Sequence, residues 1–143
     1  KLLEGEYIDE YLALSYRWMT PAHPDPDGLQ LRALQEHLHS HPSIRYVFVD
    51  FMCLPQGKDR TKTEKVEFRS MLPNINLTYL GSSVLIIMFD ATYVERFWPQ
   101  FECWLSFMQG SESGLVSTPE GQLRCTIVCL RDTPERYAHL LKD

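Results

Sequence analysis

Short apolar segments alternate with longer polar ones along the chain. Val84 to Phe89 is apolar at every position, which is typical of a parallel β-strand that is covered on both faces. Tyr11 to Tyr16, Ile44 to Phe51 and Cys125 to Leu130 are also rich in aliphatic and aromatic residues. We therefore predict four strands, each separated from the next by enough residues for a crossover helix.

The segments between the predicted strands have helical patterns. In Leu29 to His39, leucines recur at helical spacing, so one face of this predicted helix is apolar. Glu64 to Leu80 is also predicted to be mostly helical, with an interruption at Pro73. We predict a flexible loop from Gly110 to Gly121, and a last helix from Thr133, where Thr precedes Pro and Glu in a capping pattern.

The predicted elements alternate between strand and helix. This order implies an α/β fold with a central parallel sheet of four to five strands, right-handed crossovers and helices on both faces. The sequence has no internal repeat, and its 143 residues suit a single domain over residues 1–143. Because the chain begins with Lys rather than Met, we expect it to be part of a longer, multidomain protein.

The composition excludes several kinds of partner. The chain is 44% hydrophobic, but no apolar run approaches the ~20 residues of a membrane helix, so no membrane contact is expected. A formal net charge of −5 disfavours binding to nucleic acid. The cysteines show neither CxxC spacing nor the density of a disulfide scaffold. We expect a cytoplasmic protein with reduced, buried thiols at Cys53, Cys103, Cys125 and Cys129.

No resident metal or nucleotide cofactor is expected. His37, His39 and His41 lie close together, but only His37 and His41 share a helical face, and no nearby Cys or carboxylate completes a tetrahedral set. The chain also lacks the glycine-rich motifs that hold the phosphates of bound cofactors.

Glu102 is the strongest candidate for a catalytic residue. Pro99 suits the start of a helix, which places Glu102 in the first turn, beside the carboxyl end of the strand from Val84 to Phe89. Open α/β sheets bind their ligands at this edge. Since a helix N-terminus favours negative charge, we expect Glu102 to be ionised at neutral pH. The alternative is a glutamate that only complements the helix dipole.

The carboxyl end of the first strand supplies further candidates. Tyr16, Arg17 and Trp18 lie at the edge predicted for Glu102, where Arg17 is suited to hold a pyrophosphate. Alternatively, Arg17 caps a helix or pairs with an acid, and Trp18 only covers the sheet edge. Trp98 offers a stacking face to a ring of the ligand or belongs to the core, where we also expect Trp104.

Several segments, taken in order, match the pattern of one family. They are Leu14-Ser15-Tyr16-Arg17, Gly28 to Leu38, Val47-Phe48-Val49-Asp50 with Gly57-Lys58, Val84 to Tyr93, and Trp98-x-x-x-Glu102. In this order they resemble the first-strand signature, first helix, second strand with BB loop, third strand, and Trp-x-x-x-Glu element of TIR (Toll/interleukin-1 receptor) domains. The resemblance is to the branch that cleaves NAD⁺, which includes an animal axon-degeneration NADase and bacterial anti-phage proteins.

A second, related signature overlaps this one. The segment from Asp50 to Gln56, Asp-Phe-Met-Cys-Leu-Pro-Gln, is similar to the Asp-x-x-Cys-Ile-Asn-Gln signature of fungal heterokaryon-incompatibility domains, which are TIR-like. The chain also departs from the TIR pattern. Asp90-Ala91-Thr92 stands where Ser-Pro is usual, and the chain ends soon after the fourth predicted strand, so the family's fifth strand and final helix are missing or reshaped.

The resemblance implies a flavodoxin-like TIR fold and an NAD⁺ nucleosidase with a single catalytic glutamate, Glu102. NAD⁺ is then a substrate and not a cofactor, and the enzyme acts in immune or cell-death signalling. The expected substrate-binding residues are Tyr16, Arg17, Trp18 and Trp98. The resemblance also implies homotypic TIR–TIR association through an assembly loop with Gly57, Lys58 and Arg60.

A glutamate suits this reaction because its carboxylate stabilises the oxocarbenium-like ribose that forms when nicotinamide leaves. The product remains open between linear ADP-ribose, a cyclic isomer and a transferred ribosyl group. Two other functions also remain open. One is a non-catalytic TIR interaction module, and the other is a nucleoside N-glycosidase or deoxyribosyltransferase that likewise uses one glutamate at ribose.

Overall fold

The computed structural model describes residues 1–131 except 3 and 89, so the helix predicted from Thr133 lies outside the described residues. The elements, in chain order, are β1 (Tyr11–Tyr16), α1 (Leu29–Ser40), β2 (Tyr46–Phe48), α2 (Asp50–Cys53), α3 (Lys62–Met71), η1 (Leu72–Asn74), α4 (Ile75–Gly81), β3 (Ser83–Met88), η2 (Ala91–Tyr93), α5 (Phe97–Ser106), β4 (Met108–Ser111), β5 (Gly114–Ser117), η3 (Glu120–Gln122) and β6 (Cys125–Cys129).

The main sheet is parallel, as the alternation of elements predicts. Its four described strands lie in the order β2-β1-β3-β6, and all three neighbouring pairs run parallel. The residues of β3 from Val84 to Met88 are at most 1% exposed. This burial confirms that the continuous apolar run belongs to an inner strand that is covered on both faces.

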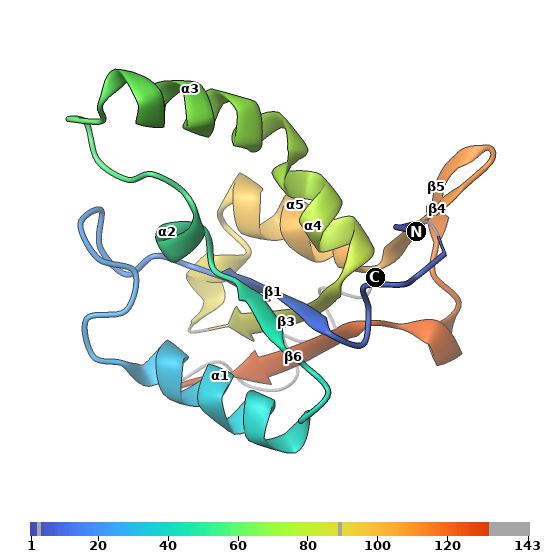
Figure 1. Ribbon diagram of the computed structural model, residues 1–143. Coiled ribbons are helices and arrows are strands. Elements are labelled where there is room, and N and C mark those ends of the chain that lie inside the picture. The colour runs from blue at the N-terminus through green and yellow to red at the C-terminus, as the bar shows by residue number, and fades with distance from the viewer. Residues whose placement is uncertain (3, 89, 132–143) are drawn as a thin grey trace.

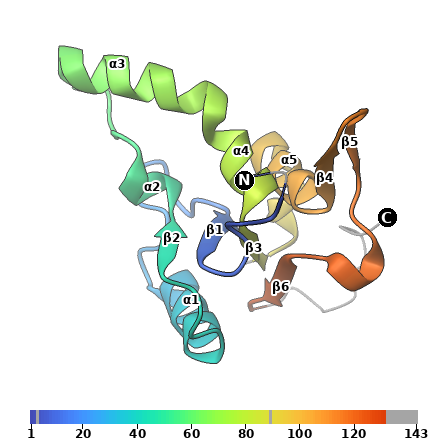
Figure 2. The ribbon, with the colours of Figure 1, turned by 45° about the vertical axis from the view of Figure 1, so that its right-hand side comes forward.

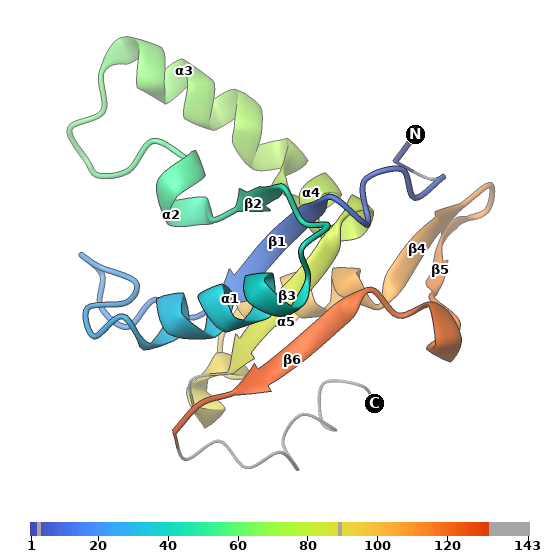
Figure 3. The same ribbon diagram turned by 60° about the horizontal axis from the view of Figure 1, so that its bottom comes forward.

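Helices cover both faces of this sheet (Figures 1 and 3). On one face, Ala33 and Leu34 of α1 pack with Leu12 of β1 and Leu85 of β3. On the other face, α4 and α5 contribute a second apolar cluster that contains Tyr79, Tyr93, Cys103 and Leu105. Since strand residues alternate between faces, Ser15 points with Ala13 toward the side of α4 and α5.

The segment predicted as a flexible loop from Gly110 to Gly121 is instead largely a β-hairpin. Its strands β4 and β5 pair antiparallel, and the hairpin projects away from the main sheet (Figure 2). Gly114 follows the turn with φ 110°, a conformation that side chains with a Cβ rarely adopt. β4 begins at Met108, only two residues after the end of α5 at Ser106.

Two further predictions concern the region between β1 and β3. The second strand is shorter than predicted, Tyr46–Phe48, because the chain turns into α2 at Asp50. The helical interruption predicted at Pro73 is confirmed, since the short 3₁₀ turn η1 separates α3 from α4 there. Proline lacks the N–H that a continuous helix would use at this position.

The four cysteines are not all buried. Cys103 is buried, Cys125 and Cys129 are half-buried, and Cys53 is exposed. Cys53 is therefore a correction to the expectation of buried thiols, because α2 is a short helix that places it at the surface. Within the described residues, no helix is both long enough and apolar enough to span a membrane.

A buried arginine joins the helices α4 and α5 to the sheet. Arg124, which precedes β6, donates hydrogen bonds to the carbonyl oxygens of Tyr79, Ser82, Leu105 and Met108 at 2.5–2.9 Å. The carbonyls of Tyr79, Ser82 and Leu105 lie at the C-terminal ends of α4 and α5, where backbone acceptors lack partners within the helix, and that of Met108 lies at the start of β4. Burial lowers the pKa of Arg124 to about 10, so it remains a cation at neutral pH.

Candidate functional site

A cleft of about 710 Å³ opens at the carboxyl end of β1, where the sequence predicts a ligand site. Its walls come from the end of β1 and the segment after it, from α2 and the loop before α3, from single residues of α3, η1 and α4, and from the first two turns of α5. The lining includes every predicted catalytic and substrate-binding residue, which are Glu102, Tyr16, Arg17, Trp18 and Trp98. The fold therefore brings together residues that are far apart in the sequence.

Glu102 lies in the second turn of α5 and not in the first. The helix begins at Phe97, because Arg96 still has extended backbone angles, and Pro99 fits within its first turn. The Oγ atom of Ser15 on β1 lies within hydrogen-bond distance, 2.7 Å, of the Oε2 atom of Glu102. Ser15 is completely buried, so the carboxyl group meets the sheet at the base of the cleft.

Burial raises the pKa of Glu102 to about 8, and the charge of Asp50 adds to this rise. Hydrogen bonds from Ser15 and Tyr79 favour the ionised form but do not outweigh desolvation. This raised pKa favours the protonated form of Glu102 at neutral pH in the empty cleft, in contrast to the ionised form that the sequence predicts. The helix dipole acts mainly on the first turn, which Glu102 does not occupy.

Two tyrosines accompany Glu102 in the buried part of the site. The hydroxyl groups of Tyr93 and Ser15 lie 2.7 Å apart, and Tyr93 also donates to the carbonyl oxygen of Pro99 at 3.0 Å. Tyr79 donates to the carbonyl oxygen of Leu14 at 3.2 Å. Desolvation raises the pKa of both phenols well above the usual value, so both are neutral donors.

Asp50 is a site residue that the sequence reasoning did not identify as one. Its carboxylate accepts hydrogen bonds from the Tyr16 hydroxyl at 2.8 Å and from the Trp18 indole Nε1 at 3.0 Å. Trp18 also packs edge-on against Phe51, with ring centroids 5.2 Å apart. A signal was available, since Asp50 follows the second strand and the carboxyl ends of neighbouring parallel strands meet at one edge.

Arg17 pairs with an acid, which was one of the three roles left open for it. Its Nη1 atom lies 2.9 Å from the Oδ2 atom of Asp90, and its side chain is 16% exposed. Within the described part of the chain, its buried Nε atom has no hydrogen-bond partner. Arg17 thus lines the cleft as a cation that Asp90 holds in place.

An aromatic row follows the exposed side of α5 from the rim of the cleft. Phe97 and Phe101 stack with centroids 5.8 Å apart, and Phe101 stacks on Trp104 at 5.9 Å. Trp98 lines the cleft and is 59% exposed, so its ring is accessible to a ligand. Trp104 is 45% exposed, which corrects its expected place in the core.

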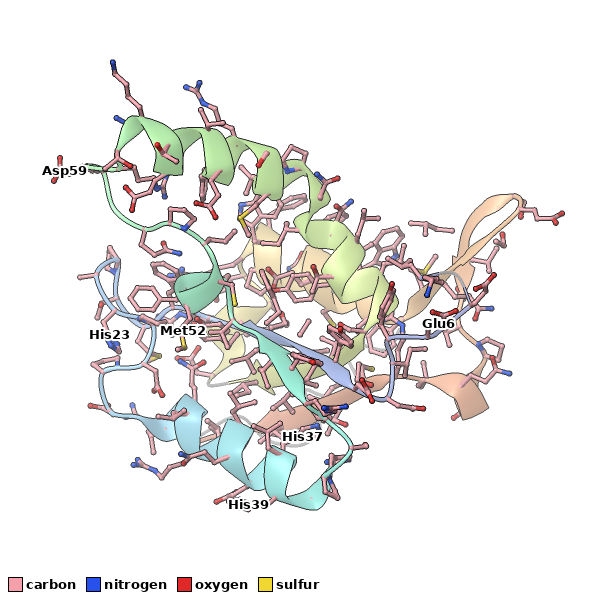
Figure 4. All side chains as sticks on the ribbon, viewed as in Figure 1. Glu6, His23, His37, His39, Met52 and Asp59 are labelled. Atoms are coloured by element: carbon pink, nitrogen blue, oxygen red, sulfur yellow. The ribbon has the colours of Figure 1, made fainter. Side chains whose placement is uncertain are left out.

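The predicted assembly loop divides into two parts. Gly57 and Lys58 are exposed, and Asp59 beside them points away from the body of the protein (Figure 4). Arg60 instead faces inward, since its Nε donates to the carbonyl oxygen of Pro55 and its guanidinium lies 3.8 Å from the Phe68 ring centroid. Arg60 thus belongs to the cleft wall.

The cleft contains a further cation that the sequence reasoning missed. Arg96 lines the cleft at the N-cap position of α5 and has an exposed side chain. Together with Arg17 and Arg60 it gives the cleft three guanidinium groups. Guanidinium groups bind phosphate oxygens through paired N–H donors. No motif marked Arg96, but its place two residues before Trp98 was a positional signal.

The histidines of α1 lie apart from this cleft, as Figure 4 shows for His37 and His39. His37 and His41 stack with ring centroids 4.0 Å apart, and burial lowers the pKa of His37. Across residues 1–131 with the two gaps, no group of at least three His, Cys, Asp or Glu residues is arranged to hold a metal ion.

Comparisons of this chain with protein-family models, with curated proteins and with solved structures found no match. The geometry alone therefore defines what the site can do. The carboxyl group of the half-buried Glu102 lies at the base of a cleft that also has aromatic surfaces and three guanidinium groups. This combination suits a ligand with flat rings and anionic groups, whose reaction passes through a positively charged centre.

Proposed function

We propose that this chain is a flavodoxin-like TIR domain that hydrolyses NAD⁺ or cyclises its ADP-ribosyl part. The observation that carries the proposal is the position of Glu102, whose carboxyl group lies at the base of a cleft of about 710 Å³ at the carboxyl edge of a parallel sheet. The resemblance of Trp98-x-x-x-Glu102 to the NADase pattern supports the same residue. A role in immune or cell-death signalling follows from that resemblance.

The raised pKa of Glu102 is compatible with this chemistry. Nicotinamide leaves NAD⁺ as a neutral molecule from a pyridinium cation, so the reaction requires a carboxylate near the ribose more than it requires an acid. A pyridinium ring that enters the cleft places a positive charge near Glu102, which lowers its pKa and favours loss of the proton. The resulting carboxylate stabilises the oxocarbenium-like ribose.

The walls of the cleft match the remaining parts of NAD⁺. The exposed ring of Trp98 is available to stack on nicotinamide or adenine. Tyr16 and Trp18 also line the cleft, and their hydrogen bonds to Asp50 hold both rings in place. The cleft also contains three arginines that can bind the pyrophosphate, Arg17, Arg60 and Arg96.

The proposal is tested by incubating concentrated protein with NAD⁺ and separating nicotinamide, ADP-ribose and cyclic products by chromatography. Glu102→Gln should abolish nicotinamide release, because Gln cannot supply the negative charge. Glu95→Gln is the matched control, since Glu95 is exposed in the turn just before α5. Retention of more than about a tenth of the activity in Glu102→Gln, about 1.4 kcal/mol of transition-state stabilisation, would refute the assignment.

One observation favours a second candidate function. A carboxyl group that keeps its proton at neutral pH can protonate the leaving base of a neutral nucleoside, as an N-glycosidase or deoxyribosyltransferase requires. Such an enzyme would exchange or release bases from deoxynucleosides and leave NAD⁺ intact. If neither substrate reacts at any protein concentration, the non-catalytic interaction module becomes the better interpretation.

A further inference from the structure

A continuous chain of oxygen atoms leads from Glu102 into the first turn of its own helix. The Oε2 atom of Glu102 lies 2.7 Å from the Ser15 hydroxyl, which lies 2.7 Å from the Tyr93 hydroxyl. The Tyr93 hydroxyl in turn lies 3.0 Å from the carbonyl oxygen of Pro99. Ser15 and Tyr93 are 0% exposed, so water does not compete for these contacts.

The number of available protons determines the direction of each hydrogen bond in this row of oxygen atoms. The three oxygen–oxygen contacts need three protons, and the Pro99 carbonyl is only an acceptor. Ser15 and Tyr93 carry one hydroxyl proton each. If Glu102 is ionised, one contact has no proton. If Glu102 is protonated, every contact becomes a hydrogen bond, each donated in the direction of Pro99.

We propose that Ser15 and Tyr93 are positioning residues that set the protonation of Glu102. In the empty cleft the protonated Glu102 donates to Ser15, Ser15 donates to Tyr93, and Tyr93 donates to the carbonyl oxygen of Pro99. When a ligand enters and Glu102 releases its proton to water, the Ser15 hydroxyl turns and donates to the carboxylate instead. This inference deepens the proposed function, on which it rests only for the catalytic role of Glu102.

The two hydroxyl groups are expected to act in opposite directions. Ser15 supplies the hydrogen bond that stabilises the ionised carboxylate, so Ser15→Ala should raise the pKa of Glu102. Tyr93 supplies the acceptor that Ser15 needs when Glu102 is protonated. Tyr93→Phe leaves the Ser15 proton without that acceptor, so it should lower the pKa of Glu102. A purely structural role would not produce shifts of opposite sign.

The other groups near Glu102 do not complete this chain. They come from each element packed against the carboxyl group: Tyr16 on β1, Asp50 on α2, Tyr79 on α4 and Cys103 on α5. Asp50 acts through its charge, and Tyr79 has one hydroxyl proton, which it shares between Glu102 and the Leu14 carbonyl oxygen. Burial raises the pKa of the Cys103 thiol to about 12, so it stays neutral.

The test follows the side-chain carboxyl signal of Glu102 by ¹³C NMR during a pH titration, with the signal assigned by its loss in Glu102→Gln. We expect Ser15→Ala and Tyr93→Phe to move the midpoint up and down respectively, by about half a unit to one unit. Ser40→Ala and Tyr46→Phe are the matched controls, because both residues are exposed and distant in the fold. Shifts of the same sign, or no shift, would overturn the proposal.

A second measurement remains informative if Tyr93→Phe does not fold. In the wild-type protein, the ring carbon that bears the Tyr93 hydroxyl should titrate with the same midpoint as Glu102, because Tyr93 changes its hydrogen bonding as the chain loses its proton. In Glu102→Gln this titration should be absent, since the amide N–H₂ of Gln donates to Ser15 at every pH. A Tyr93 signal that does not change at the titration midpoint of Glu102 would refute the proposed hydrogen-bond chain.

Neither measurement uses NAD⁺, so failure of this inference is distinguishable from failure of the proposed function. If both opposite pKa shifts are observed but no nicotinamide is released, the hydrogen-bond chain is supported and the NADase assignment is refuted. If nicotinamide is released but these pKa shifts are absent, the NADase assignment is supported and the hydrogen-bond chain is refuted.

Discussion

Replacing Glu102 with Gln should change how folding stability depends on pH. Burial raises the pKa of Glu102 from its ordinary value of 4.5 to about 8. Since one pKa unit corresponds to about 1.4 kcal/mol, the folded protein disfavours the ionised form by about 5 kcal/mol at most. Gln has nearly the same shape and no charge, so Glu102→Gln removes this cost.

The sign follows from proton binding. The folded protein binds the Glu102 proton more tightly than the unfolded chain does, so its contribution to stability is present below pH 4.5 and is lost as pH rises toward about 8. Within this window the free energy of unfolding of the wild type should fall relative to that of Glu102→Gln. Above it, the variant should be more stable by as much as about 5 kcal/mol.

The assay is urea denaturation of both proteins at intervals between about pH 4 and about pH 9, with the difference in unfolding free energy plotted against pH. Glu67→Gln, an exposed substitution on α3, shows the effect of the same chemical change away from the cleft. A difference between wild type and Glu102→Gln that does not depend on pH would refute the buried, protonated glutamate.

Three further substitutions test other parts of the structure. Asp50→Asn removes a negative charge near Glu102, so it should lower the pKa of Glu102 and move the pH profile of NAD⁺ cleavage toward acid. Arg124→Met removes the buried hydrogen bonds to four carbonyl oxygens and should cost about 3 to 5 kcal/mol of unfolding free energy, measured by urea denaturation. Lys58→Glu should lower specific activity in dilute protein at low ionic strength, because the proposed assembly docks this exposed basic loop on an acidic neighbour.

Each of these predictions has a control that makes the same chemical change at an exposed position. The controls are Asp59→Asn, Arg69→Met and Lys65→Glu. An unchanged pH profile in Asp50→Asn would show that its charge does not act on Glu102. A loss of less than about 1 kcal/mol in Arg124→Met would show that water or neighbouring donors replace its hydrogen bonds. Specific activity that stays constant on dilution and in Lys58→Glu would contradict the assembly model.

The local sequence was sufficient for most of the parallel framework. The bounds of β1 agree with the prediction from Tyr11 to Tyr16, and the apolar run from Val84 identifies β3 because an inner parallel strand is buried on both faces. The break at Pro73 was also predictable, since it depends on the chemistry of one residue. The hairpin of β4 and β5 was missed because each strand has only four residues, one of them a glycine, and shows no regular apolar alternation.

The sequence alone also placed Glu102, Tyr16, Arg17, Trp18 and Trp98 at one edge of the sheet, and the structure places all of them in one cleft. This part was predictable because the carboxyl ends of parallel strands meet at the same edge whatever the details of packing. The order of strands and helices along the chain is enough to determine which residues lie there.

Only the tertiary structure decided how those residues interact. Arg17 pairs with Asp90, and Ser15 meets Glu102 and Tyr93, although the partners are 73 to 87 residues apart in the chain. The protonation of Glu102 likewise depends on how deeply the assembled cleft buries it and on the nearby charge of Asp50. Periodicity and motifs report local backbone preference, whereas desolvation and hydrogen bonding depend on neighbours that only the folded chain brings together.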